Sequence, residues 1–153
     1  MLFIHKILEE DLINPHLQSN GKTEVLEEMS SILVDSNFIK DKKELLNKLL
    51  ERESIETTGI GHGVAIPHAR TESVDGLAMC FGLSEKGIEF NSLDNKPVHI
   101  IFLIASNEEN KNNYIQLLAR ISRICRKQSF REKIMKAETA DDVLSIFEEE
   151  ECV

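Results

Sequence analysis

The sequence of 153 residues is 41% apolar and 29% charged, which suits one compact domain over residues 1–153 with a sizeable buried core. Its formal net charge of −9 disfavours nucleic acid and anionic membranes as partners, because the average field of the surface would repel both. No apolar run approaches the ~20 residues that span a bilayer, and residues 1–6 lack the cation-then-apolar order of a signal peptide, so we expect a cytoplasmic protein with no membrane insertion.

The first third of the chain is predicted to be mainly helical. Residues 1–19 fit a short helix and one strand, and residues 22–37 carry apolar side chains on one face of a longer helix. A further helix is predicted to begin after Asp41, whose side chain can cap it while Glu44 reaches back. This helix is expected to end near Arg52.

Three apolar segments predict strands: residues 77–83, 87–90 and 98–105. The last is almost entirely apolar, which is typical of a central strand covered on both faces. Helical segments lie before and after these strands. The order predicts an α/β fold, a three-layer α/β/α sandwich around a mixed sheet of mainly four to five strands.

The C-terminal part is predicted to be helical again. Apolar residues recur at helical spacing over residues 114–125. Residues 129–132 and 139–142 each read as a capping box, which predicts two further short helices.

The three cysteines are widely spaced and form no CxxC pair, which favours free thiols in a reducing compartment. We expect Cys80 and Cys125 to be small core residues. Cys152 lies in the acidic tail and is expected to be exposed.

Residues 59–70 carry the strongest functional signal. Three glycines stand at every second position, a short apolar run follows, and Pro67-His68 comes next. Glycine allows backbone conformations that other residues avoid, while Pro67 fixes its own φ and biases Ile66 toward an extended conformation. The pattern predicts a tight bend that presents the His68 imidazole in a defined place.

A neutral imidazole is a good nucleophile near pH 7, and a phosphoryl group bound to it stays labile enough to be passed on. Such a site also needs donors to the phosphoryl oxygens. The glycine run offers backbone N–H groups, Thr57 and Thr58 offer hydroxyls, and Arg52 and Arg70 offer guanidinium groups. His68 is therefore a candidate phosphoryl acceptor.

Each candidate also has a purely structural interpretation. His68 fits a histidine that follows a turn, and Arg52 fits a cation that complements the dipole of its helix. Thr58 fits a turn residue, and Arg70 fits a solvated surface charge. Tyr114 fits the apolar face of its helix.

Other kinds of site are disfavoured. His62 and His68 match neither the i,i+4 pair of a helical metal site nor a CxxC spacing, and Cys80 and His99 would have to join them from separate strands. The glycine spacing is not GxGxxG, and no Gly-Lys-Ser/Thr follows, which excludes the dinucleotide and P-loop signatures.

The segments around His68 resemble the signature of the type-2 IIA component of the phosphoenolpyruvate-dependent sugar phosphotransferase system. That family covers fructose and mannitol IIA domains and nitrogen-regulatory IIA proteins. The resemblance spans nearly the whole chain and is carried by Arg52-Glu53, Thr58-Gly59-Ile60-Gly61, Gly63-Val64-Ala65-Ile66-Pro67-His68, and residues 93–98, 101–105 and 117–121.

The resemblance implies that His68 accepts a phosphoryl group from the phosphorylated histidine phosphocarrier protein, giving a phosphohistidine intermediate. It implies that Arg52 and Thr58 help line the phosphoryl site, that no metal or organic cofactor is needed, and that the fold has α/β/α layers. A freestanding domain with Thr58 ahead of the glycine run looks closer to the nitrogen-regulatory branch than to the mannitol domain.

The chain departs from the family at Tyr114, where sugar-specific and nitrogen-regulatory members have a second histidine. A tyrosine can donate a hydrogen bond to a phosphoryl oxygen but cannot carry a positive charge. We therefore expect Tyr114 to line the phosphoryl site and to favour a regulatory readout over fast sugar flux. His62 is a second local difference, at a position where the family often has Asn.

Two hypotheses follow. In the first, the protein is a phosphoryl-accepting IIA protein, of nitrogen-regulatory or of sugar-specific type, that hands the group to a IIB partner or changes what it binds. In the second, it is a binding module with the IIA fold that regulates a transporter, a kinase or a transcription regulator without relaying phosphate to sugar.

Overall fold

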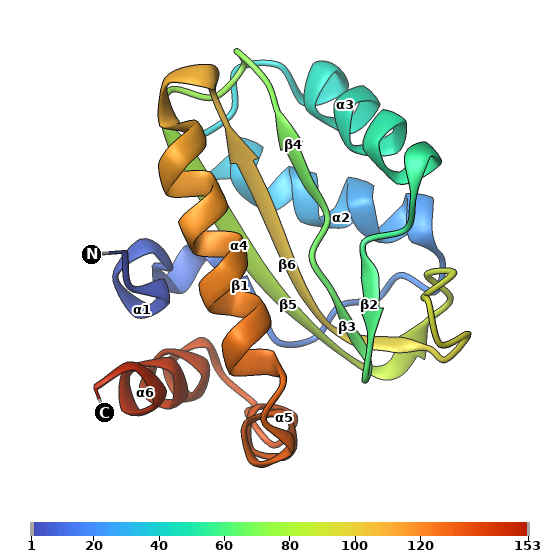
Figure 1. Ribbon diagram of the computed structural model, residues 1–153, viewed down its shortest axis with the longest axis vertical. Coiled ribbons are helices and arrows are strands. Elements are labelled where there is room, and N and C mark those ends of the chain that lie inside the picture. Colours follow the sequence, from blue (N-terminus) through green and yellow to red (C-terminus); the bar gives the residue numbers. More distant parts are fainter. Residues whose placement is uncertain (1, 153) are drawn as a thin grey trace.

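A six-stranded mixed sheet forms the middle layer in the computed structural model, which describes residues 2–152 (Figure 1). The strands follow the order β1-β5-β6-β3-β2, and β4 also pairs with β6. Their bounds are β1 Ile13–Asn14, β2 Gly59–Gly61, β3 Val64–Ala65, β4 His68–Arg70, β5 Leu77–Ile88 and β6 Val98–Ser106.

Helices cover both faces of this sheet (Figure 1). Their bounds are α1 Ile4–Ile7, α2 Lys22–Asp35, α3 Lys42–Ile55, α4 Lys111–Cys125, α5 Gln128–Ile134 and α6 Ala140–Glu151, with 3-10 turns at Glu10–Leu12 and Glu108–Asn110. No helix within residues 2–152 is both long and apolar enough to cross a membrane.

Neighbouring residues of β5 show how the two helical layers are separated. A side chain on Gly82 would collide with Met29 of α2, whereas Phe81 packs against Phe147 of α6 with ring centroids 5.3 Å apart. Successive strand residues point to opposite faces, so α2 and α6 lie on opposite sides of the sheet. The predicted α/β/α sandwich is confirmed.

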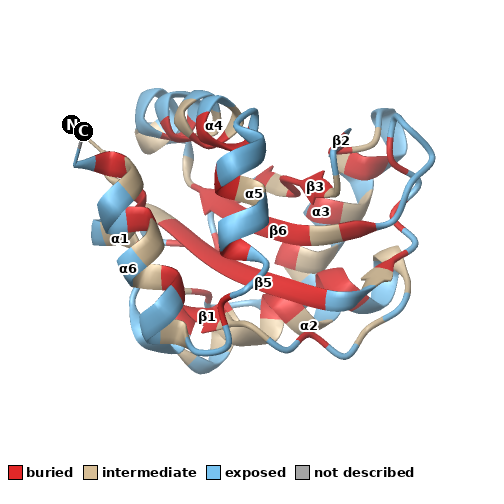
Figure 2. Ribbon diagram, turned by 90° about the horizontal axis from the view of Figure 1, so that it is seen from below, coloured by how far each residue is buried: buried red, intermediate tan, exposed pale blue. Residues whose placement is uncertain are grey.

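The segment 98–105 was predicted to be a central strand, and β6 is one. It lies between β5 on one side and β3 and β4 on the other, and eight of its nine residues are buried (Figure 2). The sheet has six strands rather than four to five because residues 59–70 supply three short strands instead of a single bend.

Residues 77–83 and 87–90 were predicted to be two strands, but β5 is continuous through residue 88. Its register against β6 shifts between Leu83 and Ile88, and Gly87 adopts a φ of 93° there. A bulge at a glycine lets the strand bend without ending, which explains why the two predicted strands are one.

The predicted helix caps are confirmed in part. The Asp41 side chain accepts a hydrogen bond from the Glu44 N–H at 3.1 Å, but Glu44 accepts from the Thr71 hydroxyl instead of reaching back. Thr139 and Asp142 form the predicted capping box of α6. The box at residues 129–132 is wrong, because α5 begins at Gln128 and places Ser129 inside its first turn.

The three cysteines are free thiols, as predicted. Cys80 and Cys125 are buried, and Cys152 is exposed. Burial raises the pKa of Cys125 to about 12, so this thiol is protonated and inert at neutral pH.

Candidate functional site

A cavity of about 450 Å³ lies between the C-terminal half of α3, strand β4 and the first turns of α4. Three of the four predicted site residues, His68, Arg52 and Tyr114, line it together. Its full lining is Lys48, Glu51, Arg52, Ile55, His68, Ala69, Arg70, Lys111, Tyr114 and Ile115.

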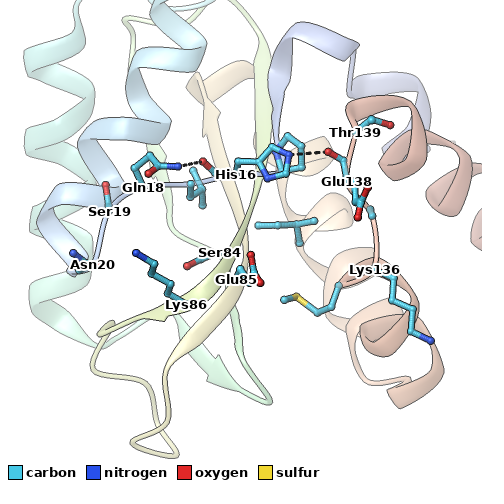
Figure 3. A pocket seen from close by; sticks show the side chains of 15 residues that line it. His16, Gln18, Ser19, Asn20, Ser84, Glu85, Lys86, Lys136, Glu138 and Thr139 are labelled. Carbon is cyan, nitrogen blue, oxygen red and sulfur yellow. Dashed lines mark hydrogen bonds between the residues drawn. The ribbon is translucent and has the colours of Figure 1, made fainter.

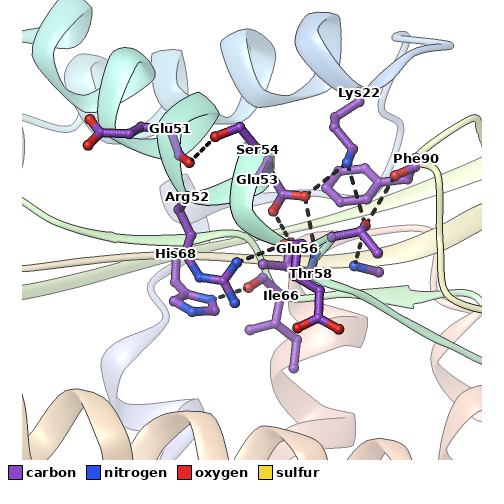
Figure 4. A network of polar contacts seen from close by, with 12 residues as sticks. Lys22, Glu51, Arg52, Glu53, Ser54, Glu56, Thr58, Ile66, His68 and Phe90 are labelled. Carbon is purple, nitrogen blue, oxygen red and sulfur yellow. Dashed lines mark hydrogen bonds and ion pairs between the residues drawn. The ribbon is translucent and has the colours of Figure 1, made fainter.

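His68 is oriented by a hydrogen bond to the backbone that joins β3 to β4. Strands β3 and β4 pair with successive parts of β6, and the chain between them is Ile66-Pro67. Because Pro67 has no N–H, it cannot continue the ladder as a donor. The Pro67 carbonyl still accepts from the Ile104 N–H at 3.0 Å, and the Ile66 carbonyl accepts a hydrogen bond of 2.6 Å from Nδ1 of His68 (Figure 4).

This hydrogen bond decides which ring nitrogen can react. A carbonyl oxygen only accepts, so Nδ1 must carry the ring proton. In the neutral imidazole, the lone pair available for attack is then on Nε2. His68 is half-buried and lines the cavity, so its ring is within reach of a ligand there.

The surroundings also keep this imidazole neutral. Burial lowers the pKa of His68 below its ordinary value of 6.5, and the positive charge of Arg52 lowers it further. The hydrogen bond to Ile66 and the charge of Glu53 oppose these effects. His68 is therefore present mainly as the uncharged nucleophile at pH 7.

Arg52 lies at the end of its helix and also lines the cavity. It lies in the last turn of α3, where its Nη1 donates to the Glu56 carbonyl at 2.7 Å. This bond satisfies a carbonyl at the end of the helix. The same guanidinium group lines the cavity and lowers the pKa of His68 (Figure 4).

Tyr114 likewise serves both the core and the cavity. It is 8% exposed, and its ring meets that of His68 edge to face, with centroids 5.6 Å apart. Burial raises the pKa of Tyr114 to about 12, against the opposing effects of Arg70 and Arg52. The phenol is therefore neutral at pH 7 and can act there as a hydrogen-bond donor.

Thr58 lies outside the cavity lining. It is buried, its N–H donates to Glu53 at 3.1 Å, and its hydroxyl donates to the same carboxylate. Its carbonyl accepts from the Ile66 N–H at 3.0 Å. Thr58 thus reaches the site through its backbone, with its hydroxyl already engaged.

The glycine run also lies apart from the cavity. It forms the β2–β3 hairpin, in which a side chain at Gly59 would collide with Ser92. Gly61, His62 and Gly63 all adopt positive φ, with His62 at 57°. The run was expected to give N–H groups to a phosphoryl site, but its residues form the turn of the β2–β3 hairpin.

His62 occupies its unusual position for a backbone reason. Its N–H donates to Asp94 at 3.2 Å, and histidine tolerates the left-handed region better than most residues, as asparagine does.

Within residues 2–152, no group of three or more His, Cys, Asp or Glu side chains is arranged to hold a metal ion.

Two lysines of the cavity were missed by the sequence reasoning. Lys48 lies one turn before Arg52 on α3, and Lys111 lies one turn before Tyr114 on α4. Neither forms an ion pair within the described chain. Their i,i+4 and i,i+3 spacing to predicted site residues was the signal that could have identified them.

The cavity therefore surrounds a neutral nucleophile with cations. Lys48, Arg52, Arg70 and Lys111 contribute four positive charges to the lining, and Glu51 contributes the single carboxylate. Arg70 also pairs with Glu108 at 3.2 Å. Such a site suits an anion that reacts at Nε2 of His68.

A larger cavity, of about 730 Å³, is lined by residues 15–20, 83–86 and 135–139 and contains none of the predicted site residues (Figure 3). There Nε2 of His16 lies 2.8 Å from the Glu138 carbonyl, which can only accept. His16 therefore links residues 15–20 to residues 135–139 by a hydrogen bond.

Comparison with known proteins shows which family the chain belongs to. The model of the phosphoenolpyruvate-dependent sugar phosphotransferase system EIIA 2 family matches residues 6–150. A fructose-specific EIIA component from Haloferax volcanii is 34% identical over 145 residues, which cover 93% of this chain and 94% of that protein. A fructose-specific EIIABC component from Bacillus subtilis is 35% identical over 143 residues, which are 94% of this chain but only 22% of that longer protein.

A solved structure agrees with these relatives. The crystal structure of the nitrogen regulatory protein IIA-Ntr from Neisseria meningitidis superposes with a TM-score of 0.87 at 27% identity, covering 94% of this chain and 98% of that one. The predicted resemblance is confirmed. The chain belongs to the type-2 IIA family of the phosphoenolpyruvate-dependent sugar phosphotransferase system.

Proposed function

We propose that this protein accepts a phosphoryl group on Nε2 of His68 from the phosphorylated histidine phosphocarrier protein. The observation that carries the proposal is the 2.6 Å hydrogen bond from Nδ1 to the Ile66 carbonyl, which leaves the Nε2 lone pair for attack. The cations of the cavity support it, because a phosphoryl group carries negative charge on three oxygens.

The transfer exchanges one N–P bond for another. Nε2 of His68 attacks the phosphorus of the donor phosphohistidine in line, and the donor N–P bond breaks with its electron pair left on the donor imidazole. Nδ1 of His68 keeps its proton, so its ring becomes positively charged. The Ile66 carbonyl stabilises that charge through the bond it already accepts.

The remaining lining groups stabilise the group in transit. Arg52, Lys48 and Lys111 face the phosphoryl oxygens with positive charge, and Tyr114 donates its hydroxyl proton in a hydrogen bond. Thr58 contributes by fixing the backbone next to Ile66. The transfer as written uses no metal and no organic cofactor.

The phosphorylated protein then acts as a nitrogen-regulatory type of IIA protein, changing which transporter, kinase or regulator it binds. The structural similarity to IIA-Ntr supports the nitrogen-regulatory type. Tyr114 cannot carry an imidazolium charge, which favours a regulatory readout over fast onward transfer without distinguishing the two branches. The similarity to fructose components supports a second candidate, a sugar-specific protein that passes the group to a IIB component.

Replacement of the acceptor tests the proposal directly. With phosphoenolpyruvate, enzyme I and the phosphocarrier protein, the native chain should gain one acid-labile phosphate, whereas His68→Ala should gain none. Intact-mass analysis measures both. His62→Asn is the matched control and should be phosphorylated normally, because asparagine also tolerates the left-handed backbone at that position. Equal labelling of His68→Ala would overturn the proposal.

The pKa of His68 should respond to Arg52. Removing a neighbouring positive charge makes the imidazolium less unfavourable, so Arg52→Gln should raise the pKa of His68 from its lowered native value. NMR titration of the ring measures this shift. Lys43→Gln is the control: it removes an exposed charge of the same helix about 14 Å away along the axis, where salt screens it. An unchanged or lower pKa in Arg52→Gln would contradict the assigned electrostatics.

Substitutions of Tyr114 distinguish the two readouts. If the missing imidazole limits onward transfer, Tyr114→His should accelerate transfer from phosphorylated His68 to a fructose-type IIB component by about tenfold or more. Tyr114→Phe should slow phosphorylation of His68, because it removes the donor and keeps the ring. Rapid quench-flow kinetics measure both rates. No change in either variant would show that Tyr114 only packs beside the site.

A further inference from the structure

A buried carboxylate lies immediately behind the wall of the cavity. Glu53 follows Arg52 on α3, is 8% exposed and takes no part in the cavity lining. An ionised carboxylate in such a place is costly unless it is paired and hydrogen-bonded. The contacts of Glu53 therefore show which groups it stabilises.

Glu53 holds one segment of backbone and one cation. Its Oε1 accepts from the Thr58 N–H at 3.1 Å and lies 3.0 Å from Nζ of Lys22, while the Thr58 hydroxyl donates to Oε2 (Figure 4). Lys22 also lies over the ring of Phe90, with Nζ 4.8 Å from its centroid. The start of α2, the end of α3 and the entry to β2 are joined at this one carboxylate.

Hydrogen bonds lead from Glu53 to the reactive ring. Thr58, held by Glu53, accepts from the Ile66 N–H through its carbonyl at 3.0 Å. The carbonyl of Ile66 then accepts from Nδ1 of His68 at 2.6 Å. Three successive links, Glu53 to Thr58, Thr58 to Ile66 and Ile66 to His68, thus connect a buried ion pair to the nucleophile.

We propose that Glu53 is the positioning residue of His68, acting through Thr58 and Ile66 to fix the Nδ1–H tautomer and to aim Nε2 into the cavity. The effect on phosphoryl transfer rests on the function proposed above, whereas the effect on the tautomer does not. Its negative charge also opposes the lowering of the pKa of His68 by Arg52, in keeping with its place beside the site.

Lys22 is the charged partner of the Glu53 carboxylate, with Nζ 3.0 Å from Oε1. Removing Lys22 leaves a buried, unpaired carboxylate, and removing Glu53 leaves a half-buried, unpaired ammonium group, whereas removing both leaves neither. The Lys22–Glu53 ion pair therefore allows two variants that separate the loss of the hold on Thr58 from the effect of an unpaired lysine. Glu53→Gln weakens the hold on Thr58 and strands Lys22, and the double variant Lys22→Met/Glu53→Gln weakens the same hold without a stranded charge.

The experiment combines ring NMR with phosphorylation kinetics. In native protein, long-range ¹H–¹⁵N spectra should show neutral His68 as the Nδ1–H tautomer, and in Glu53→Gln the Nε2–H tautomer should become measurable. The rate of His68 phosphorylation should fall about 10- to 100-fold, as expected for a slightly misplaced nucleophile. The KM for the phosphocarrier should stay unchanged, because Glu53 lies outside the cavity lining.

Matched variants separate positioning from general damage. Glu27→Gln breaks an exposed ion pair between α2 and α3, Glu27 to Lys42 at 3.8 Å, and should change the rate by less than about twofold. The double variant at Lys22 and Glu53 should keep the rate loss and the tautomer change of Glu53→Gln. A native tautomer and a native rate in the double variant would overturn the proposal, because the stranded lysine would then be the whole cause.

The two proposals fail in different ways. If native protein is never phosphorylated, the proposed function is wrong, yet the tautomer spectra still test Glu53 without any phosphoryl donor. If native protein is phosphorylated and Glu53→Gln retains both its tautomer and its rate, the positioning role is wrong and the phosphoryl-acceptor function stands.

Discussion

The hydrogen bond from Nδ1 of His68 to the Ile66 carbonyl is the constraint on which the rest of the site depends. It forms on the side of the chain that faces Thr58, whose carbonyl accepts from the Ile66 N–H while its own N–H donates to Glu53 rather than to Ile66. One backbone atom thereby sets the tautomer, the direction of the ring and the atom that reacts. The same bond can hold the positive ring that phosphorylation on Nε2 would create.

The cavity lining carries a positive net charge, whereas the chain as a whole carries a negative one. The sequence carries a net charge of −9, yet the lining has four cations and one carboxylate. A cationic hollow in an acidic surface attracts a small dianion locally, while the average field repels polyanions such as nucleic acid. Tyr114 adds a neutral donor in place of a second imidazole, so fixed cations supply the positive charge of this site.

Sequence reasoning singled out His68 and Arg52 by local pattern, namely Pro-His after an apolar run and a cation at a helix end. Tyr114 was singled out by the family resemblance, which has a second histidine at that position. The central strand and the flanking helices followed from periodicity. The role of Thr58 could not be predicted from the sequence, because its hydroxyl donates to the Glu53 carboxylate. The position of that carboxylate depends on how α2 packs against α3. The glycine run was misread for a similar reason, since its close approach is to Ser92 rather than to a ligand.

¹⁵N–³¹P correlation NMR of the phosphorylated protein measures directly which nitrogen of His68 is bonded to phosphorus. Because Nδ1 is held by the Ile66 carbonyl, we expect a phosphorus coupled to Nε2, with Nδ1 still bearing its proton toward that carbonyl. A phosphorus coupled to Nδ1 would contradict it, because that product requires the bond to Ile66 to be broken.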